Sequence, residues 1–289
     1  MDYTSVKQKG KHIIVSGIKN FCPTQILDCG QAFRWHLAEE MDDGKTYSGF
    51  AHGRRLSLTY KNDTLILYDT SLHEFEETWK GYFDLDRNYE ELHTLFIRYD
   101  ADNMKKTLAY SPGLRLMRQD PWEILISFIL SQNSNIPRIK KMISLLCENF
   151  GKALPCGGFA FPDAKTLAIL SPSDLADIKS GYRAPYIIDA AKQVVSGALD
   201  LSPSRPTAEI KKALLNVHGV GPKVADCVLL FGFGKLECFP LDVWMKRVMA
   251  KMYPCGFPAE LNDYAGIAQQ YLFHYARNTF SPKPEKEVL

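Results

Sequence analysis

A lysine that follows a glycine-rich turn could act as a nucleophile. The turn HGVG at residues 218–221 interrupts a long apolar-periodic segment, and Pro222 and Lys223 begin the next helical pattern. A helix dipole disfavours an ammonium group in the first turn, and burial would favour the neutral amine, which is the nucleophilic form. Lys223 is therefore a candidate nucleophile. The alternatives are a solvated surface lysine or one paired with Asp226.

The turn itself could hold a phosphate. Gly219 and Gly221 permit positive φ and close backbone approach, and Pro222 suits the opening turn of a helix. The backbone N–H groups of Gly219, Val220 and Gly221 would then lie at the positive end of that helix. A tight turn with a purely structural role is the alternative.

An aspartate stands nineteen residues after the lysine, in FPLDVW at residues 239–244. Asp242 opens a helical pattern and is a natural N-cap. A carboxylate held at a helix N-terminus can also face positive charge that develops on a sugar. Capping and catalysis are compatible at this position, and the spacing alone leaves both open.

The elements that position these residues follow two different hydrophobic periodicities, one typical of strands and one typical of helices. Between residues 12 and 70, the segments HIIVSGI, TYSGFA, RRLSLTY and DTLILYD alternate apolar and polar residues, which predicts an antiparallel sheet. After about residue 105 the pattern is helical. We therefore predict an α+β protein, with an N-terminal antiparallel sheet domain over residues 1–106 and an all-helical domain over residues 107–289. The second domain contains a helix-hairpin-helix at about 207–232, capped by Thr207, and an aspartate loop at about 233–243.

A buried helix opens the helical domain. Asp120 can cap it, Pro121 suits its first turn, and Glu123 has the spacing of a capping box. Its body, ILISFIL, is apolar nearly all round, which is typical of a helix in the middle of a domain. The polar run SQNSN at 131–135 must then emerge at a specific place, with an ordinary loop as the alternative.

Composition limits the class of protein. The chain has 289 residues and a net charge of +2, from 35 Lys+Arg against 33 Asp+Glu, so any DNA affinity must come from local patches. No run approaches the ~18 apolar residues of a membrane span, and no signal peptide is visible. Seven cysteines show neither zinc nor iron–sulfur spacing, so we expect reduced thiols, no catalytic metal and no cofactor. We expect the Pro/Lys/Glu-rich tail after Ser281 to be disordered.

One long stretch carries a family resemblance. LLNVHGVGPKVADCVLLFGFGKLECFPLDVWMKRV resembles the helix-hairpin-helix, Gly/Pro-rich loop and aspartate motif of DNA glycosylases, and KVADC resembles the 8-oxoguanine DNA glycosylases in particular. The further matches are CGQAFRW, DPWEILISFILSQNSNIPRI, SGYRAPYI and YAGIAQQYLF, which extend the resemblance over most of the chain.

The resemblance implies a bifunctional glycosylase and lyase that acts on double-stranded DNA containing 8-oxoguanine, as a monomer. The target nucleotide would be flipped out of the duplex. Lys223 would attack the sugar C1′ and expel the base, leaving a Schiff base that permits strand cleavage by β-elimination. Asp242 would stabilise the oxocarbenium-like transition state and help to orient the lysine.

The resemblance also assigns the base pocket. Gly30 in CGQAFRW matches the glycine whose carbonyl accepts the N7 hydrogen that distinguishes 8-oxoguanine from guanine. Cys227 and Phe273 match the side chains on the two faces of the base, and Gln269 matches the amide that reads its Watson-Crick edge. Helical spacing independently puts Gln269 and Phe273 on one face, about opposite the apolar stripe of that helix.

Four further positions match the residues that face the opposite strand. Asn133, Arg138 and Arg183 match those that read the unpaired cytosine, and arginine supplies a donor fork suited to its acceptors. Tyr182 matches the wedge that fills the vacated stack. Taken singly, each residue has a surface or loop role as the alternative.

Two positions depart from the animal members of the family. Trp244 stands where those enzymes carry a histidine that contacts DNA, and Ala276 stands where they carry its acidic partner. An indole N–H can still donate to a phosphate. The departures suggest a bacterial branch and hence a cytoplasmic, nucleoid-associated enzyme, while details of phosphate contact, including a cation at the hairpin, stay open.

Other classes fit less well. Glycosylases for alkylated or deaminated bases share the hairpin and aspartate but usually lack the lysine. Iron–sulfur relatives need a compact C-terminal cluster of four cysteines, and only Cys255 lies beyond Cys238. A DNA-binding module without catalysis would need neither the lysine nor the aspartate. A zinc base deaminase would need His-x-Glu and Pro-Cys-x-x-Cys elements, which are absent.

Overall fold

The N-terminal part of the chain is a six-stranded antiparallel sheet in the order β1-β2-β6-β5-β4-β3. The computed structural model describes residues 1–41 and 44–281, so the tail after Ser281 lies outside the described residues. The alternating segments correctly predicted β2, β4, β5 and β6. The strands are β1 Ser5–Lys9, β2 His12–Ser16, β3 Trp35–Met41, β4 Gly44–Ala51, β5 Arg54–Lys61 and β6 Thr64–Tyr68.

Cross-strand pairs place one face of the sheet in a hydrophobic core. Ile13 lies opposite Leu67, which in turn lies opposite Leu58, and all three side chains are fully buried. Short helices contribute Phe75 and Trp79 to the same core. These are α1 Pro23–Leu27, α2 Leu72–Glu74, η1 Phe75–Trp79 and α3 Lys80–Tyr82.

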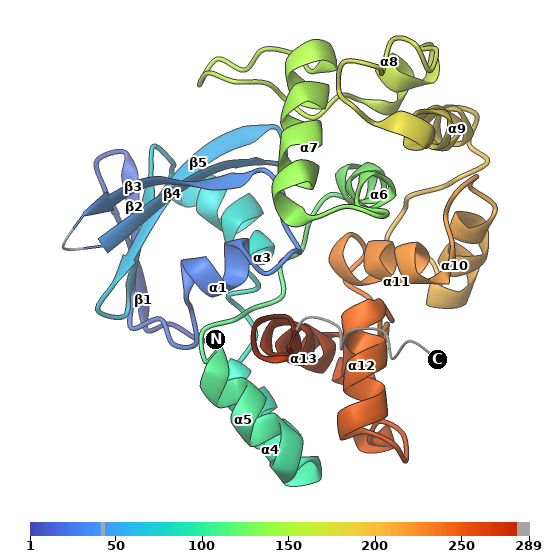
Figure 1. Cartoon of the computed structure of the whole chain (residues 1–289). Helices are drawn as coiled ribbons and strands as arrows, with labels where there is room; N and C mark the ends of the chain where they lie inside the picture. Colours follow the sequence, from blue (N-terminus) through green and yellow to red (C-terminus); the bar gives the residue numbers. More distant parts are fainter. Residues whose placement is uncertain (42–43, 282–289) are drawn as a thin grey trace.

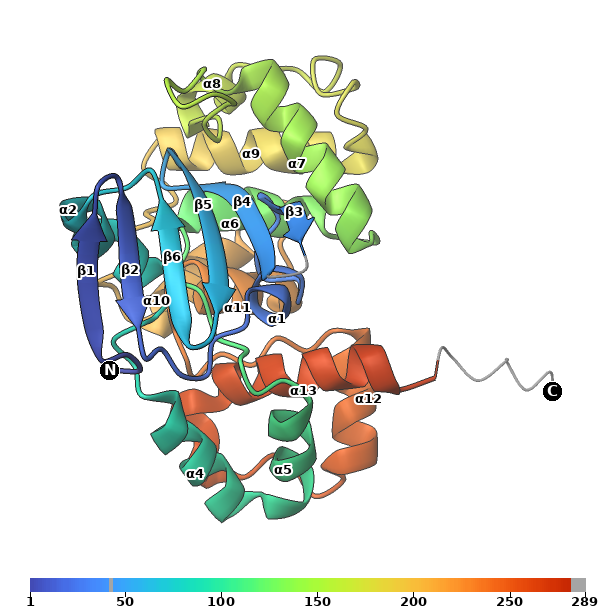
Figure 2. The same ribbon diagram turned by 90° about the vertical axis from the view of Figure 1, so that its left-hand side faces the viewer.

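The rest of the chain is helical and surrounds α6, whose residues Ile124–Leu130 are all buried, as predicted. The sheet stands to the left of these helices in Figure 1, and α6 lies behind it in Figure 2. The helices are α4 Tyr89–Tyr99, α5 Ala101–Tyr110, α6 Pro121–Leu130, α7 Ile136–Phe150, α8 Ala164–Ala168, η2 Gly181–Arg183, α9 Ala184–Val195, α10 Thr207–Leu215, α11 Pro222–Phe231, α12 Val243–Met252, η3 Ala259–Tyr264 and α13 Ala265–Thr279.

The helices α4 and α5, which begin before the predicted division at residues 106/107, pack with the helical core. Leu85 belongs to the sheet core, whereas Tyr89 already belongs to the helical core. The reason is that α4 and α5 bury their apolar faces, including Phe96 and Met104, among the helices, and α5 packs on α13. The two helices lie beside α13 in both ribbon views (Figures 1 and 2).

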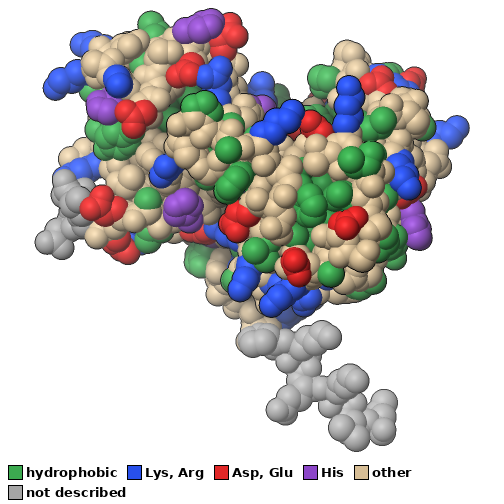
Figure 3. Space-filling model, turned by 90° about the horizontal axis from the view of Figure 1, so that it is seen from above, with side chains coloured by type: hydrophobic (Ala, Val, Ile, Leu, Met, Phe, Trp, Pro, Cys, Tyr) green, Lys and Arg blue, Asp and Glu red, His purple; other side chains and the backbone are tan. Residues whose placement is uncertain are grey.

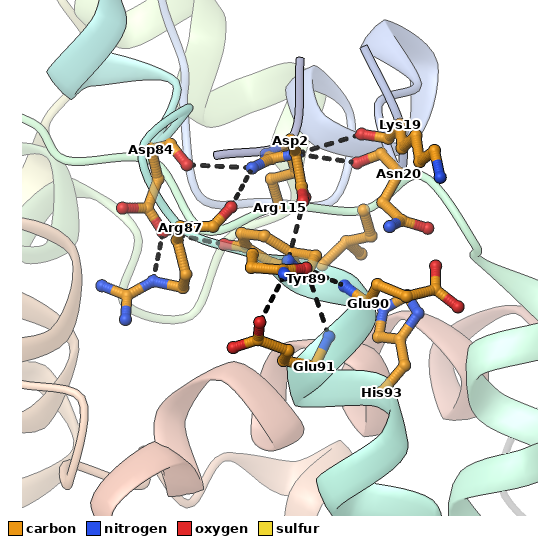
Figure 4. A network of polar contacts seen from close by, with 12 residues as sticks. Asp2, Lys19, Asn20, Asp84, Arg87, Tyr89, Glu90, Glu91, His93 and Arg115 are labelled. Atoms are coloured by element: carbon orange, nitrogen blue, oxygen red, sulfur yellow. Dashed lines mark hydrogen bonds and ion pairs between the residues drawn. The ribbon is translucent and has the colours of Figure 1, made fainter. Parts of the chain in front are cut away.

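A buried arginine joins the segments between the two cores (Figure 4). Arg115 is fully buried and donates to the Asp2 carboxylate at 3.0 Å and to the Asp84 carbonyl oxygen at 2.9 Å. Its guanidinium carbon lies 4.1 Å from the Tyr89 ring centroid, and the Tyr89 N–H donates to Asp2. The beginning of the chain, the end of the sheet domain and α4 are thereby fixed to one side chain.

Two of the predicted helix caps differ in the structure. Asp120 caps α6 as predicted, accepting from the Glu123 N–H at 2.9 Å, but the Glu123 carboxylate pairs with Arg34 at 3.3 Å instead of completing a capping box. Burial raises the pKa of Glu123 to about 7 against the lowering effect of Arg34. Thr207 does not cap α10, because Pro206 is the cap residue and the Thr207 hydroxyl bonds Glu237.

Charged side chains of both signs share the surface. Seen from above the view of Figure 1, Lys and Arg are spread over this face with Asp and Glu among them (Figure 3). The distribution agrees with the near-neutral net charge. None of the helices in the described part of the chain is long and apolar enough to cross a membrane.

Candidate active site

A cavity of about 610 Å³ collects residues from distant parts of the sequence. Its wall includes the turn at Gly30, the end of α6, the loop that follows it, the start of α11, the aspartate loop and α13. Of the predicted site residues, Arg138, Tyr182, Arg183 and the hairpin lie outside this wall. The predicted residues that line it are Gly30, Asn133, Lys223, Cys227, Asp242, Trp244, Gln269 and Phe273.

Lys223 is half-buried in the first turn of α11. Its Nζ lies 5.2 Å from the centroid of the Phe128 ring, and Cys227 follows one turn further along the helix. The alternative pairing with Asp226 is wrong, because Asp226 forms its ion pair with Lys211 at 2.6 Å. The amine therefore lies at the cavity wall without a carboxylate at ion-pair distance among the described residues.

Cys227 is buried beside the lysine. Burial raises the pKa of its thiol to about 11, and the Lys223 charge partly offsets that rise. At neutral pH the side chain is therefore an uncharged, polarisable surface in the wall. Such a surface suits contact with a flat ring better than it suits nucleophilic attack, for which a thiolate is needed.

Asp242 is the N-cap of α12, as its position in the sequence predicted. Its Oδ1 accepts from the Met245 N–H at 2.8 Å, which fixes the carboxylate at the rim of the cavity. The aspartate loop is held from α13, since Gln269 Nε2 donates to the Pro240 carbonyl oxygen at 3.2 Å. The carboxylate and the lysine thus face one space from two helix N-termini.

The same wall contains an unsatisfied hydrogen-bond acceptor. Gln269 is only 4% exposed, and its Oε1 has no hydrogen-bond partner among the described residues. A buried amide oxygen without a partner costs free energy, so a ligand that brings a donor to it gains that contact. Phe273 lies one helical turn further on and lines the same cavity, so the predicted shared face is correct.

Gly30 adopts a conformation that favours glycine. Its φ is +88°, and a Cβ there would lie 3.2 Å from Ile136 Cδ1 and 3.7 Å from Phe273 Cε1. The backbone therefore approaches the cavity as closely as it does because no side chain intervenes. The Gly30 carbonyl oxygen accepts no hydrogen bond within residues 1–41 and 44–281.

The hairpin between α10 and α11 differs in part from its prediction. Gly219 has φ +81°, and a Cβ there would lie 2.2 Å from the Tyr186 ring. The predicted close approach of the backbone is therefore correct at Gly219, where it is to the Tyr186 side chain. Gly221 has φ −93° and needs no positive φ. The Val220 N–H already donates to Val217, whereas those of Gly219 and Gly221 donate to no described residue. The hairpin therefore offers two free donors at the α11 N-terminus.

The residues predicted to face the opposite strand meet around the loop after α6. Asn133 Nδ2 donates to the Tyr182 hydroxyl at 3.0 Å, and Tyr182 is 48% exposed. Arg183 is only 3% exposed and donates to the carbonyl oxygens of Gln132 and Ser180. Arg138 is exposed in the first turn of α7. Arg183 is thus engaged with backbone in this structure.

Several residues of the cavity wall were not predicted from the sequence, among them Gln132, Lys246 and Arg277. Gln132 Nε2 donates to the Gly219 carbonyl oxygen at 3.1 Å, which joins the loop after α6 to the hairpin. Lys246 and Arg277 add positive charge to the wall. Charged residues on an amphipathic helix look like an ordinary solvated face, so only their place beside the cavity distinguishes them.

Trp244 and Ala276, which depart from the animal members of the family, differ in their surroundings. The Arg247 guanidinium lies 4.9 Å from the Trp244 ring centroid, so an aromatic–cation pair stands at the start of α12. Ala276 is fully buried. In the described ranges 1–41 and 44–281, no group of three or more His, Cys, Asp or Glu side chains could hold a metal ion.

Comparisons with known proteins agree along the chain. The family model for the 8-oxoguanine DNA glycosylase N-terminal domain matches residues 13–125, and that for the HhH-GPD superfamily base excision DNA repair proteins matches residues 126–260. An N-glycosylase/DNA lyase of Saccharomyces cerevisiae is 31% identical over 80% of this chain and 68% of its own length.

A solved structure is similar over almost the whole length. It is the Clostridium acetobutylicum 8-oxoguanine glycosylase/lyase in complex with double-stranded DNA containing cytosine opposite 8-oxoG, with 36% identity and a TM-score of 0.89. The match covers 96% of this chain and 99% of that one. The chain therefore belongs to the 8-oxoguanine DNA glycosylase family, within the HhH-GPD superfamily of base excision DNA repair enzymes.

Proposed function

We propose that this enzyme removes 8-oxoguanine from double-stranded DNA with Lys223 as nucleophile and then cleaves the strand by β-elimination. The observation that carries the proposal is one cavity lined by a half-buried lysine, a fixed carboxylate and an unsatisfied buried amide. The similar Clostridium acetobutylicum enzyme, solved with DNA containing 8-oxoG, supports the choice of base.

The chemistry follows from the positions of these groups. A flipped nucleotide would bring its C1′ to the Lys223 amine, the C1′–N9 bond would break, and the base would leave with the electron pair. Positive charge that develops on the sugar would face the Asp242 carboxylate, which is already fixed by the Met245 N–H. Transfer of a proton from the attached nitrogen to the ring oxygen O4′ breaks the C1′–O4′ bond and gives the Schiff base. Removal of a C2′ proton then breaks the 3′ C–O bond by β-elimination, and the phosphate leaves with the electron pair.

Recognition of the base is assigned to four residues. The Gly30 carbonyl oxygen would accept the N7 hydrogen of 8-oxoguanine, and Gln269 Oε1 would accept from the Watson-Crick edge. Both oxygens lack partners in the described residues, which supports these roles. The Cys227 thiol and the Phe273 ring would contact the two faces of the base. Outside the cavity, the free N–H groups of Gly219 and Gly221 would hold a phosphate. Trp244, which lines the cavity, would donate its indole N–H to another phosphate.

Trapping with borohydride tests the function directly. The wild-type enzyme incubated with an 8-oxoguanine:cytosine duplex and borohydride is expected to give a covalent protein–DNA complex, since reduction converts a Schiff base to a stable amine. A matched duplex with guanine should give none. Release of free base without a trapped complex would instead indicate a glycosylase that uses water, as expected for an enzyme acting on alkylated or deaminated bases.

Replacing the ring at position 273 should weaken lesion binding. We expect Phe273→Ala to lower affinity for 8-oxoguanine duplex by about fivefold to a hundredfold, because a base–aromatic stack contributes ~1 to 3 kcal/mol. Phe257→Ala is the matched control, since Phe257 is also half-buried but does not line the cavity. The measurement is equilibrium binding to lesion and undamaged duplexes. Equal losses in both variants would place the base elsewhere.

Cytosine is the expected partner of the lesion. Arg138 and Arg183 can donate to the O2 and N3 acceptors of cytosine, whereas adenine offers a poorer acceptor pattern and leaves donors unpaired. We expect excision opposite cytosine to be roughly tenfold faster than opposite adenine, or more. For Arg183 this requires exchange of its backbone acceptors at Gln132 and Ser180 for the base.

The opposite-base preference is checked by single-turnover excision from four duplexes that differ only in the opposing base. Arg138→Ala and Arg183→Ala should each reduce the preference while leaving excision opposite adenine little changed. Lys179→Ala, an exposed residue just before η2, serves as the control. Equal wild-type rates opposite cytosine and adenine would contradict the role of both arginines without affecting that of Lys223.

A further inference from the structure

Two buried glutamines hold the peptide segment on either side of Gly30. The side chains of Gln31 and Gln270 are both almost fully buried, although both are polar. Gln31 follows Gly30 directly, and Gln270 stands on α13 between Gln269 and Tyr271. We refer to Gln31 and Gln270 as the amide brace.

Gln31 fixes the segment from the side of the interdomain connection. Its Nε2 donates to the carbonyl oxygens of Ile26 at 3.0 Å and Arg115 at 2.7 Å, and its Oε1 accepts from the Met117 N–H at 2.9 Å. Its backbone carbonyl oxygen accepts from Gln119 Nε2 at 2.8 Å. Gln31, the residue that follows the Gly30 carbonyl, is therefore held by hydrogen bonds of both its side chain and its backbone.

Gln270 fixes the segment from the side of α13. Its Nε2 lies 3.3 Å from the Cys29 carbonyl oxygen and 3.0 Å from the Cys29 Sγ, so both amide hydrogens are directed to the residue before Gly30. The Cys29 Sγ in turn donates to the Ile26 carbonyl oxygen at 3.2 Å. Because Gln269 and Gln270 are neighbours on one helix, the brace ties the position of Gly30 to that of the amide that lines the cavity.

The need for such a brace follows from the geometry of Gly30. A glycine with φ +88° has no side chain to restrict it, so its carbonyl direction is set by its neighbours. A single hydrogen bond to the N7 position distinguishes the lesion only if the acceptor is already in place, since an acceptor that must reorganise loses much of its selectivity.

We propose that Gln31 and Gln270 are positioning residues for base discrimination, which fix the Gly30 carbonyl oxygen at the distance from Gln269 that an 8-oxoguanine base requires. The proposal rests on the proposed function, because it assumes that this carbonyl reads the base. Gln270 also borders the cavity, but on the side of Gly30 and Gln269, and neither glutamine is assigned to the reacting atoms. Loss of the brace should therefore affect recognition of the base and spare the chemistry of Lys223.

The test compares two reactions of the same enzyme. Excision of 8-oxoguanine needs the base pocket, whereas cleavage at a preformed abasic site needs Lys223 but places no base in the pocket. Gln270→Met keeps the side-chain length and removes both donors to Cys29. We expect the ratio of the single-turnover excision rate to the abasic-site cleavage rate to fall about tenfold, as for loss of one or two buried hydrogen bonds.

Controls separate the possible results. Gln8→Met removes a hydrogen-bonded amide on β1, which does not line the cavity, and should leave the ratio unchanged. A ratio within about twofold of wild type in folded Gln270→Met, or a parallel fall of both rates, overturns the proposal. If Gln270→Met does not fold, Gln270→Asn, which keeps the amide but is too short to reach Cys29, takes its place. A wild-type enzyme that cleaves abasic sites but leaves 8-oxoguanine intact would instead refute the proposed function.

Discussion

Lys223→Gln is expected to lose both the borohydride-trapped complex and base excision, while it still binds 8-oxoguanine duplex. The substitution removes the only atom proposed to attack C1′, so no Schiff base can form. Binding should persist because the base-side groups Gly30, Gln269 and Phe273 are untouched. The measurements are trapping on denaturing gels, single-turnover excision and equilibrium binding to the lesion duplex.

Lys246 provides the matched control, because it is the other lysine in the wall of the cavity. Lys246→Gln should retain trapping and lose at most some affinity through a weaker phosphate contact. The opposite pattern, with trapping kept in Lys223→Gln and lost in Lys246→Gln, would move the nucleophile to α12. Retention of trapping in both single variants would place it outside the cavity.

Asp242→Asn should lower the single-turnover rate by roughly 10²- to 10³-fold and change lesion affinity much less. A fixed charge that stabilises mainly the transition state typically contributes ~3 to 4 kcal/mol to the barrier. Asparagine caps a helix about as well as aspartate does, so α12 should keep its N-terminal turn. The rate would be measured with enzyme in excess over an 8-oxoguanine:cytosine duplex.

Asp120→Asn makes the same change at another helix N-cap. Asp120 caps α6 through the Glu123 N–H but does not line the cavity, so this variant should excise at nearly the wild-type rate. A comparable loss in both variants would assign the effect to helix capping. A rate for Asp242→Asn within about threefold of wild type, with the fold intact, would contradict the electrostatic role.

Local sequence patterns predicted the elements that position the candidate residues. Alternation identified the central strands, Pro222 and the glycines identified the hairpin, and the positions of Asp120 and Asp242 identified two caps that the structure confirms. These features depend on interactions between residues only a few positions apart. The strand β1 was not predicted because SVKQK is a polar edge strand, stabilised by pairing with β2 rather than by an apolar face.

Interactions over long sequence separations decided the rest. The Glu123 carboxylate does not complete the expected capping box, because it pairs with Arg34, which lies 89 positions away in the sequence. Arg183 lies buried against the loop after α6, where a short segment in isolation would suggest an exposed side chain. The apolar faces of α4 and α5 joined the helical core because that is where they find an apolar surface to cover.

By itself, the sequence determined the fold class and the helix-hairpin-helix, because each depends on local periodicity, turn residues and capping. It singled out Lys223 and Asp242 as candidates through the family resemblance, and their catalytic roles stay predictions. Only the tertiary structure decided that Lys223 is not paired with Asp226, that Gln269 keeps an unsatisfied oxygen in the cavity, and that Gln31 and Gln270 brace Gly30. Buried polar groups choose partners by distance in space, and the contact between Gln270 and Cys29 joins residues 241 positions apart.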